Sequence, residues 1–156
     1  MKVIYVPKGA AREYADLACN LYYGCPGRCR YCYVPPLLRV SRNAYGGWAE
    51  PRPNVVYHLQ GDLYSLRMRR DKRPVFLCFT SDPYPGVCET TRKALEEFGR
   101  SGHPVTILTK MTDLAVRDLD LLALIPGAMA MVSLVWEDDE QRALWEPGAS
   151  SVASRL

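Results

Sequence analysis

Apolar residues gather in four short, nearly continuous stretches of this chain, separated by longer segments of mixed polarity. Continuous apolar runs of this length are typical of strands that are buried on both faces of a parallel sheet. The pattern therefore predicts strands at residues 16–22, 75–80, 103–110 and 128–135. The second and third of these stretches end in polar residues, so they would bring polar side chains to one edge of the sheet.

The segments between these strands show apolar residues at helical spacing. We expect helices that begin at the capping residues Asn54, Thr90 and Thr112, the second running to Arg100 and the third to Leu124. Strand and helix thus alternate, which predicts an α/β fold with a parallel sheet and right-handed crossovers. The alternation alone leaves open whether the sheet is open and doubly wound or part of a barrel.

The remaining segments carry weaker patterns. Residues 1–15 predict an extended lead-in, and residues 33–53, rich in proline and glycine, predict a long loop. Residues 136–156 are acidic at first and then rich in proline, glycine and serine. A helix is expected to start near Ser150 in this last segment.

Length and composition limit the class of protein. A chain of 156 residues can form one domain with a hydrophobic core, and 48% hydrophobic with 24% charged residues is ordinary for a soluble globular protein. No apolar run approaches the roughly 20 residues of a membrane span. The N-terminus lacks the apolar region of a signal peptide, so we expect a cytoplasmic protein. The net charge of +3 favours anionic partners only weakly.

Three cysteines are concentrated in the loop Cys25-Pro-Gly-Arg-Cys29-Arg-Tyr-Cys32, directly after the first predicted strand. Gly24, Pro26 and Gly27 allow the backbone to turn tightly there, so the three thiolates can converge on one small object. Three thiolates are one ligand short of a closed tetrahedral metal site. On an iron–sulfur cluster the same shortfall leaves one iron free to bind a substrate or a cofactor.

Two other interpretations of these cysteines stay open at this point. A structural zinc site could take Cys19 as its fourth ligand, although Cys19 lies in the predicted strand and zinc knuckles usually pair two CxxC hairpins. Disulfides are the other alternative, but six cysteines without a secretory signal favour a reducing compartment. We expect Cys19 to be a small buried residue of the strand.

The CxxxCxxC spacing, with an aromatic residue before the third cysteine, resembles the cluster loop of the radical S-adenosylmethionine (SAM) enzymes. This resemblance implies that Cys25, Cys29 and Cys32 hold a [4Fe–4S] cluster whose fourth iron binds SAM, and that Tyr31 packs against the adenine. It also implies that the reduced cluster cleaves SAM to a 5′-deoxyadenosyl radical. The fold would then be a partial (β/α) barrel of the TIM type.

Within that superfamily the chain is most similar to the group of spore photoproduct lyase. The similarity rests on short motifs in the family's order, which are Asn20-Leu-Tyr-Tyr-Gly-Cys25, Cys32-Tyr-Val-Pro35, Thr80-Ser-Asp-Pro-Tyr84 with Glu89, Thr91-Arg92, Thr109-Lys110, Arg117-Asp118, Asp120-Leu-Leu122, Ser133, Glu146-Pro147 and Arg155-Leu156. They run from Asn20 to Leu156, so the resemblance covers nearly the whole chain and implies one radical SAM domain over residues 1–156. Only about four β/α units are present, so the resemblance implies a barrel truncated on its C-terminal side, with an exposed sheet edge at the last strand.

The resemblance also assigns SAM contacts. Ser81 and Asp82 follow the second strand, where a hydroxyl and a carboxylate can pair with the amino group of SAM. Lys110 ends the third strand, where a cation can pair with the SAM carboxylate, although an ordinary exposed lysine is the alternative. Ser133 lies late in the fourth strand, where its hydroxyl can bind the carboxylate or the ribose. All four lie at C-terminal strand ends, where barrel enzymes place their chemistry.

One departure from the family concerns the hydrogen-atom donor. Spore photoproduct lyase has a cysteine near the end of its second strand, and this chain has Phe79 at the aligned position. Cys78 is one residue away, so strand alternation would turn it to the other face. Repair of a DNA lesion by the lyase mechanism is therefore poorly supported. Cys88, in the following loop, is expected to be a plain loop cysteine.

We therefore expect a radical SAM enzyme, lyase-like, that abstracts hydrogen from an unidentified substrate and receives electrons from a flavodoxin or ferredoxin. A nucleic-acid substrate is favoured by the resemblance and the mild basicity alone.

The alternative is a non-catalytic module that binds a cluster or zinc, with the basic run Arg67–Arg73 as a nucleic-acid patch. That run precedes the second strand and would lie at the opposite edge of the sheet from the chemistry. We expect His58 to be a surface or satisfied side chain. The sequence specifies neither the catalytic residues nor the oligomeric state.

Overall fold

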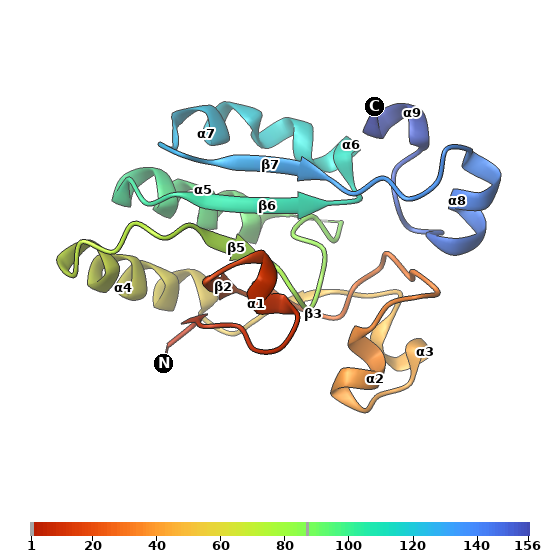
Figure 1. Ribbon diagram of the computed structural model, residues 1–156, viewed down its shortest axis with the longest axis horizontal. Helices are drawn as coiled ribbons and strands as arrows, with labels where there is room; N and C mark the ends of the chain where they lie inside the picture. Colours follow the sequence, from red (N-terminus) through yellow and green to blue (C-terminus); the bar gives the residue numbers. More distant parts are fainter. Residues whose placement is uncertain (1, 87) are drawn as a thin grey trace.

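A five-stranded sheet runs through the computed structural model, which describes residues 2–86 and 88–156 (Figure 1). Its strands lie in the order β1 (Ile4–Tyr5), β2 (Leu17–Cys19), β5 (Val75–Leu77), β6 (Val105–Thr109) and β7 (Met129–Val132). The strands β2, β5, β6 and β7 are mutually parallel, and β1 pairs antiparallel with β2. The prediction of an α/β fold with a parallel sheet is confirmed, and the four parallel strands fall inside the four predicted stretches.

The first predicted strand is shorter than expected, because the chain leaves the sheet after Cys19. The side-chain oxygen of Asn20 accepts hydrogen bonds from the backbone N–H groups of Phe79 (2.8 Å) and Thr80 (3.1 Å). The chain then forms β3 (Tyr22–Tyr23), which pairs antiparallel with β4 (Glu50–Pro51) in a separate two-stranded ribbon. The cysteine loop therefore follows this ribbon rather than the central sheet directly.

Helices connect the parallel strands and cover one face of the sheet (Figure 1). They are α4 (Val55–Met68), α5 (Glu89–Ser101) and, after β6, α6 (Thr112–Ala115), the 3₁₀ turn η1 (Val116–Asp118) and α7 (Leu119–Leu124). The core lies between these helices and the sheet, and it includes Leu59, Leu63, Leu95, Phe98, Leu122, Val75, Leu77 and Ile107. This arrangement leaves the opposite face of the central strands available for a cavity.

The helix start predicted at Asn54 is confirmed in position, and the starts predicted at Thr90 and Thr112 were wrong by one or two residues. Asn54 precedes α4 in a left-handed conformation (φ 52°) without capping it through its side chain, and Thr90 lies inside α5, whose N-cap is Cys88. Thr112 is the first residue of α6, and its hydroxyl donates to the carbonyl of Ser154 (2.8 Å) instead of capping the helix. Tertiary contacts thus take up side chains that the local pattern assigns to caps.

The predicted long loop at residues 33–53 contains short elements. It forms α2 (Val34–Leu38), α3 (Arg42–Tyr45) and the strand β4. Ser41 caps α3 by accepting a hydrogen bond from the Ala44 N–H (3.1 Å). The lead-in holds β1 and α1 (Ala11–Tyr14), and the C-terminal segment forms α8 (Asp139–Trp145) and α9 (Val152–Arg155). The helix expected near Ser150 is therefore confirmed.

The carboxyl ends of β5, β6 and β7 point toward the side of the molecule where α2, α3 and α8 lie (Figure 1). The basic run Arg67–Arg73 spans the end of α4 and the approach to β5, at the opposite end of the sheet. The strand β7 forms one edge of the sheet, and Met129 and Val132 on it are exposed. Within the described residues, no helix combines the length and the apolar character that crossing a membrane requires.

His103 gives the fold a specific pH dependence. Its ring is buried, its Nε2 lies 2.9 Å from the Arg73 carbonyl oxygen, and burial lowers its pKa below the ordinary value near 6.5. The unfolded chain therefore binds a proton more readily than the folded chain, so stability falls as the pH drops below about 6.5. Urea denaturation at pH 7.5 and 5.0 measures this effect. Between these two pH values the free energy of unfolding should fall more in the wild type than in His103→Gln. The variant His58→Gln measures the contribution of the chain's other histidine. An equal loss in wild type and His103→Gln would contradict this assignment.

Candidate functional site

The three cysteines of the loop lie on a shared wall between two cavities. Cys25, Cys29 and Cys32 line a cavity of about 300 Å³ on the sheet side and a second cavity of about 400 Å³ on the side of α3. The turn at Gly24 (φ 70°) requires glycine, because a Cβ there would lie 2.5 Å from the Trp48 carbonyl oxygen. The structure thus brings the three predicted ligands together, each of them half-buried.

The sulfur positions bear on the kind of metal group that would fit. Among residues 2–86 and 88–156, no three or more His, Cys, Asp or Glu side chains are grouped so that they could hold a metal ion. In an iron–sulfur cluster each thiolate binds a different iron atom, so the sulfurs surround a larger volume than a single ion does. Gly27 lies between two of them, where a Cβ would be 3.4 Å from Cys25 Sγ and 3.9 Å from Cys29 Sγ. The described residues thus show no preformed site for a single metal ion at this loop, and the [4Fe–4S] cluster stays a prediction.

Burial controls the protonation of these thiols. It raises the pKa of Cys29 to about 11, although the ammonium of Lys110 acts in the opposite direction, and it also raises the pKa of Cys25. Both thiols are therefore protonated at neutral pH in the metal-free chain. Since thiolates are the metal ligands, loading the loop with iron would release protons.

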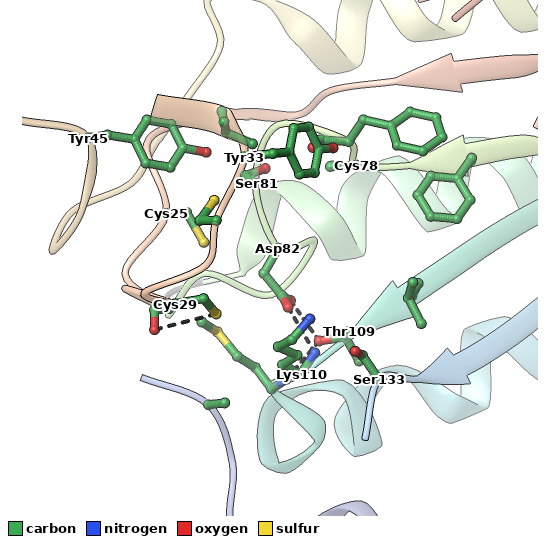
Figure 2. A pocket seen from close by; sticks show the side chains of 18 of the residues that line it. Cys25, Cys29, Tyr33, Tyr45, Cys78, Ser81, Asp82, Thr109, Lys110 and Ser133 are labelled. Atoms are coloured by element: carbon green, nitrogen blue, oxygen red, sulfur yellow. Dashed lines mark hydrogen bonds between the residues drawn. The ribbon is translucent and has the colours of Figure 1, made fainter. Parts of the chain in front are cut away.

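The predicted strand-end residues line the sheet-side cavity (Figure 2). Ser81 has a buried hydroxyl oxygen without a hydrogen bond of normal geometry to the described residues, although its contact with the Cys78 thiol acts to lower the pKa of that thiol. Lys110 and Ser133 come from the ends of β6 and β7. Ser133 is held by its backbone, because its N–H donates to the Thr109 carbonyl (2.9 Å) and its carbonyl accepts from Arg155 Nη1 (2.9 Å). A buried hydroxyl that lacks a normal hydrogen bond at a cavity wall is the kind of group that a polar ligand satisfies.

Asp82 also lines this cavity, but its carboxylate already has three donors. It accepts hydrogen bonds from the Thr109 hydroxyl (2.6 Å), the Lys110 N–H (2.9 Å) and the Tyr84 N–H (2.9 Å). Burial raises its pKa, and these hydrogen bonds oppose that rise. The carboxylate therefore ties the end of β5 to the end of β6, as the dashed lines in Figure 2 show.

Tyr31 is the one predicted cofactor residue that lines neither cavity. Its hydroxyl donates to Glu146, and its ring centroid lies 6.0 Å from Lys110 Nζ. The side chain is 44% exposed. The predicted contact with adenine thus stays a prediction, and the observed contact is with the C-terminal segment.

Glu146 and Arg155 belong to two of the motifs in which the sequence resembles the family, and no role was predicted for either. In the structure they form an ion pair (2.7 Å) in which both side chains are fully buried. Arg155 also donates through Nε to the Ser150 carbonyl (2.9 Å) and through Nη1 to the Ser133 carbonyl. Together with the Tyr31–Glu146 hydrogen bond, this network links the cysteine loop to the end of β7. The only sequence signal for this network was the spacing of two charged residues in a segment that otherwise consists mostly of small residues.

Gly148 brings the same segment against the cysteine loop. Its N–H donates to the Gly27 carbonyl (3.1 Å), and a Cβ at this position would lie 2.3 Å from the Pro26 carbonyl oxygen. The Arg30 N–H donates to the Trp145 carbonyl (2.9 Å) in parallel. The backbone of residues 145–148 therefore packs directly on the loop that carries the cysteines.

The expected orientation of Cys78 was wrong. Both Cys78 and Phe79 line the sheet-side cavity, because β5 ends at Leu77 and the strict alternation of a strand no longer applies beyond it. The Cys78 thiol is buried and accepts a hydrogen bond from the Leu21 N–H (3.4 Å). Burial raises its pKa to about 12.

The other cysteines behave as expected. Cys88 is buried in the loop before α5, and its thiol donates to the Gly86 carbonyl (2.7 Å) without lining either cavity. Cys19 is fully buried in β2. All six cysteines are free thiols in this structure.

Comparisons with known proteins do not extend this picture. No protein-family model matches the chain, and neither the curated proteins nor the solved structures give a match. The resemblance to radical SAM enzymes therefore rests on the sequence motifs alone and stays a prediction.

The contact at Gly148 yields a test of how the cysteine loop is held. Gly148→Ala should lower the free energy of unfolding by about 1–3 kcal/mol, because the added methyl overlaps the backbone of Pro26 and Gly27. Gly61→Ala is the matched control: it lies inside α4 with no atom within 4 Å of its Cβ position, and it should raise stability by about 0.5–1 kcal/mol. Urea denaturation measures both, and limited trypsin digestion should cut faster after Arg28 and Arg30 in Gly148→Ala. Wild-type stability and digestion in that variant would show that the segment does not hold the loop.

Proposed function

We propose that this chain is a radical SAM protein of the spore photoproduct lyase-like group, built on a partial (β/α) barrel. One observation carries the proposal. The cysteines of the CxxxCxxC motif line the same cavity as Ser81, Lys110 and Ser133, which come from three successive strand ends. Convergence of a cluster motif and polar strand ends on one cavity is the arrangement that such chemistry needs.

The cysteine loop supplies the cluster ligands in this proposal. Cys25, Cys29 and Cys32 would hold a [4Fe–4S] cluster and leave one iron without a protein ligand. When bound and reduced, the cluster would supply the electron that cleaves SAM to a 5′-deoxyadenosyl radical, which abstracts hydrogen from the substrate. The protein's own task is to place SAM and to keep the thiols half-buried.

The strand ends supply the SAM contacts. The Lys110 ammonium would pair with the SAM carboxylate, and the buried hydroxyl of Ser81 would accept from the SAM amino group. Ser133 would hydrogen-bond the carboxylate or the ribose. Asp82 adds negative charge to the same wall while it fixes the backbone of Lys110 through their 2.9 Å hydrogen bond. A cavity of about 300 Å³ falls at the lower end of the range for small-molecule sites.

The substrate would have to enter at this end of the sheet. The basic run Arg67–Arg73 lies at the other end of the sheet, so we do not include it in the substrate path. Within this run, Arg73 is paired with Asp71 (2.6 Å). We propose a nucleic acid as the substrate class on the basis of the resemblance. We place the protein in the cytoplasm, where the reducing environment suits six free thiols.

Anaerobic reconstitution followed by electron paramagnetic resonance (EPR) spectroscopy tests the proposal. The reconstituted chain should bind about four iron atoms and give a reduced [4Fe–4S] signal. Addition of SAM should change that signal, because SAM would bind the open iron. Ser81→Ala and Lys110→Ala should retain the cluster while weakening the response to SAM at least tenfold in SAM concentration, since each would lose one charged or polar contact worth about 1.4 kcal/mol or more.

Cysteine substitutions provide the matched controls. Cys29→Ser should lose most of the iron, whereas Cys88→Ser, which changes a buried thiol outside both cavities, should retain it. A reduced cluster whose EPR signal ignores SAM would contradict SAM binding. Binding of one zinc ion per chain in place of iron and sulfide would contradict the whole proposal.

A further inference from the structure

The second cavity differs in character from the first. Besides the three cysteines and Tyr45, which it shares with the sheet-side cavity, it is lined by Arg28, Arg30 and Arg42. All three arginines are exposed, and none forms an ion pair with a carboxylate of the described residues. Arg42 also donates to the Cys32 carbonyl (3.0 Å). The cysteine loop thus has one face toward the strand ends and another toward unpaired cations.

Positive charge is concentrated around this cavity. Residues 24–49 contain four arginines and no lysine, aspartate or glutamate, which gives +4, while the whole chain has a net charge of +3. The rest of the chain therefore sums to −1, from +3 minus +4. A surface with this concentration of one sign attracts an oppositely charged partner over a distance of about 10 Å at 0.1 M salt.

Exposed apolar side chains accompany these arginines. Leu37 and Leu38 of α2 are 65% and 49% exposed, and Trp48 after α3 is 43% exposed. Arginine and tryptophan are both enriched in protein–protein interfaces, where apolar contacts lie inside a charged rim. Figure 1 shows α2 and α3 projecting from the molecule beside the cysteine loop. We name the surface formed by Arg28, Arg30 and Arg42 around the second cavity the arginine face.

We propose that the arginine face is the docking surface for an acidic electron-transfer protein. The inference rests on the proposed function, because it requires a cluster between the two cavities. On docking, the reduced partner gives one electron to the cluster; the partner is oxidised by one electron and the cluster is reduced by one. Docking at this face brings the donor directly to the cysteines, and it leaves the sheet-side cavity free for SAM and substrate.

Position and chemistry favour a protein partner over a nucleic acid here. A nucleic-acid substrate must present its reacting atom in the sheet-side cavity, whereas none of the three arginines lines that cavity. An electron donor has the opposite requirement, because it must approach the cluster without blocking that cavity. Acidic surfaces opposite such arginines raise association rates at low ionic strength.

Reduction kinetics test the docking surface separately from the cluster. The variant Arg28→Glu/Arg30→Glu is compared with Arg69→Glu/Arg70→Glu, which makes the same charge change in the basic run at the other end of the sheet. Each reconstituted protein is mixed anaerobically with photoreduced flavodoxin, and bleaching of the cluster absorbance is followed by stopped flow. At low salt we expect reduction of the first variant to slow at least tenfold, with the control close to wild type, and this difference should shrink at high salt.

Dithionite distinguishes the two ways in which the experiment can fail. This small reductant needs no docking surface, so both variants and the wild type should give equal reduced EPR signals with it. Absence of a signal in the wild type would contradict the proposed cluster rather than the arginine face. Equal rates with flavodoxin in all three proteins would overturn the docking proposal. Loss of affinity for a single-stranded oligonucleotide, with unchanged reduction by flavodoxin, would overturn it in favour of a nucleic-acid surface.

Discussion

The buried ion pair between Glu146 and Arg155 holds together the parts of the candidate site that are far apart in sequence. Removal of one partner from such a pair leaves an uncompensated buried charge, which typically costs about 3–5 kcal/mol. Here the pair also orders backbone: Arg155 binds the Ser133 carbonyl, and Glu146 accepts from Tyr31. The cysteine loop, the end of β7 and the C-terminal segment are therefore stabilised as a unit.

The strand ends are organised by a second set of contacts that does not involve the cysteines. Asn20 fixes the backbone after β5, and Asp82 joins that backbone to Thr109 and Lys110. Parallel pairing of β5, β6 and β7 makes their carboxyl ends neighbours, so every one of these strand ends contributes residues to the wall of the same cavity. The site is thus a rigid polar sheet edge facing a loop that is attached from outside.

Sequence reasoning located what depends on local pattern. The apolar runs predicted the parallel strands because β2 and β5 are buried on both faces and β6 is at least half-buried, whereas β7 is exposed along most of its length at the sheet edge. Polar residues after 79 and 109 marked the cavity edge. It failed where a distant residue determines the local structure. The Thr112 hydroxyl binds the Ser154 carbonyl rather than capping a helix. Cys78 faces the cavity because β5 ends at Leu77, one residue before it. The Glu146–Arg155 pair joins segments whose proximity only the tertiary fold establishes, so no periodicity could predict it.

The two cavities beside the cysteine loop differ in the charged residues that line them, and this difference accounts for the uneven distribution of charge along the chain. The sheet-side wall combines Lys110, Asp82 and hydroxyl groups, a mixture that suits a zwitterionic small molecule with both an ammonium and a carboxylate. Among the described residues that line the other cavity, the arginines are the only Lys, Arg, Asp or Glu side chains, which suits a macromolecular anion and would hold a zwitterion poorly. In the proposed function, this arrangement would serve a centre that receives an electron from one direction and uses it in the other.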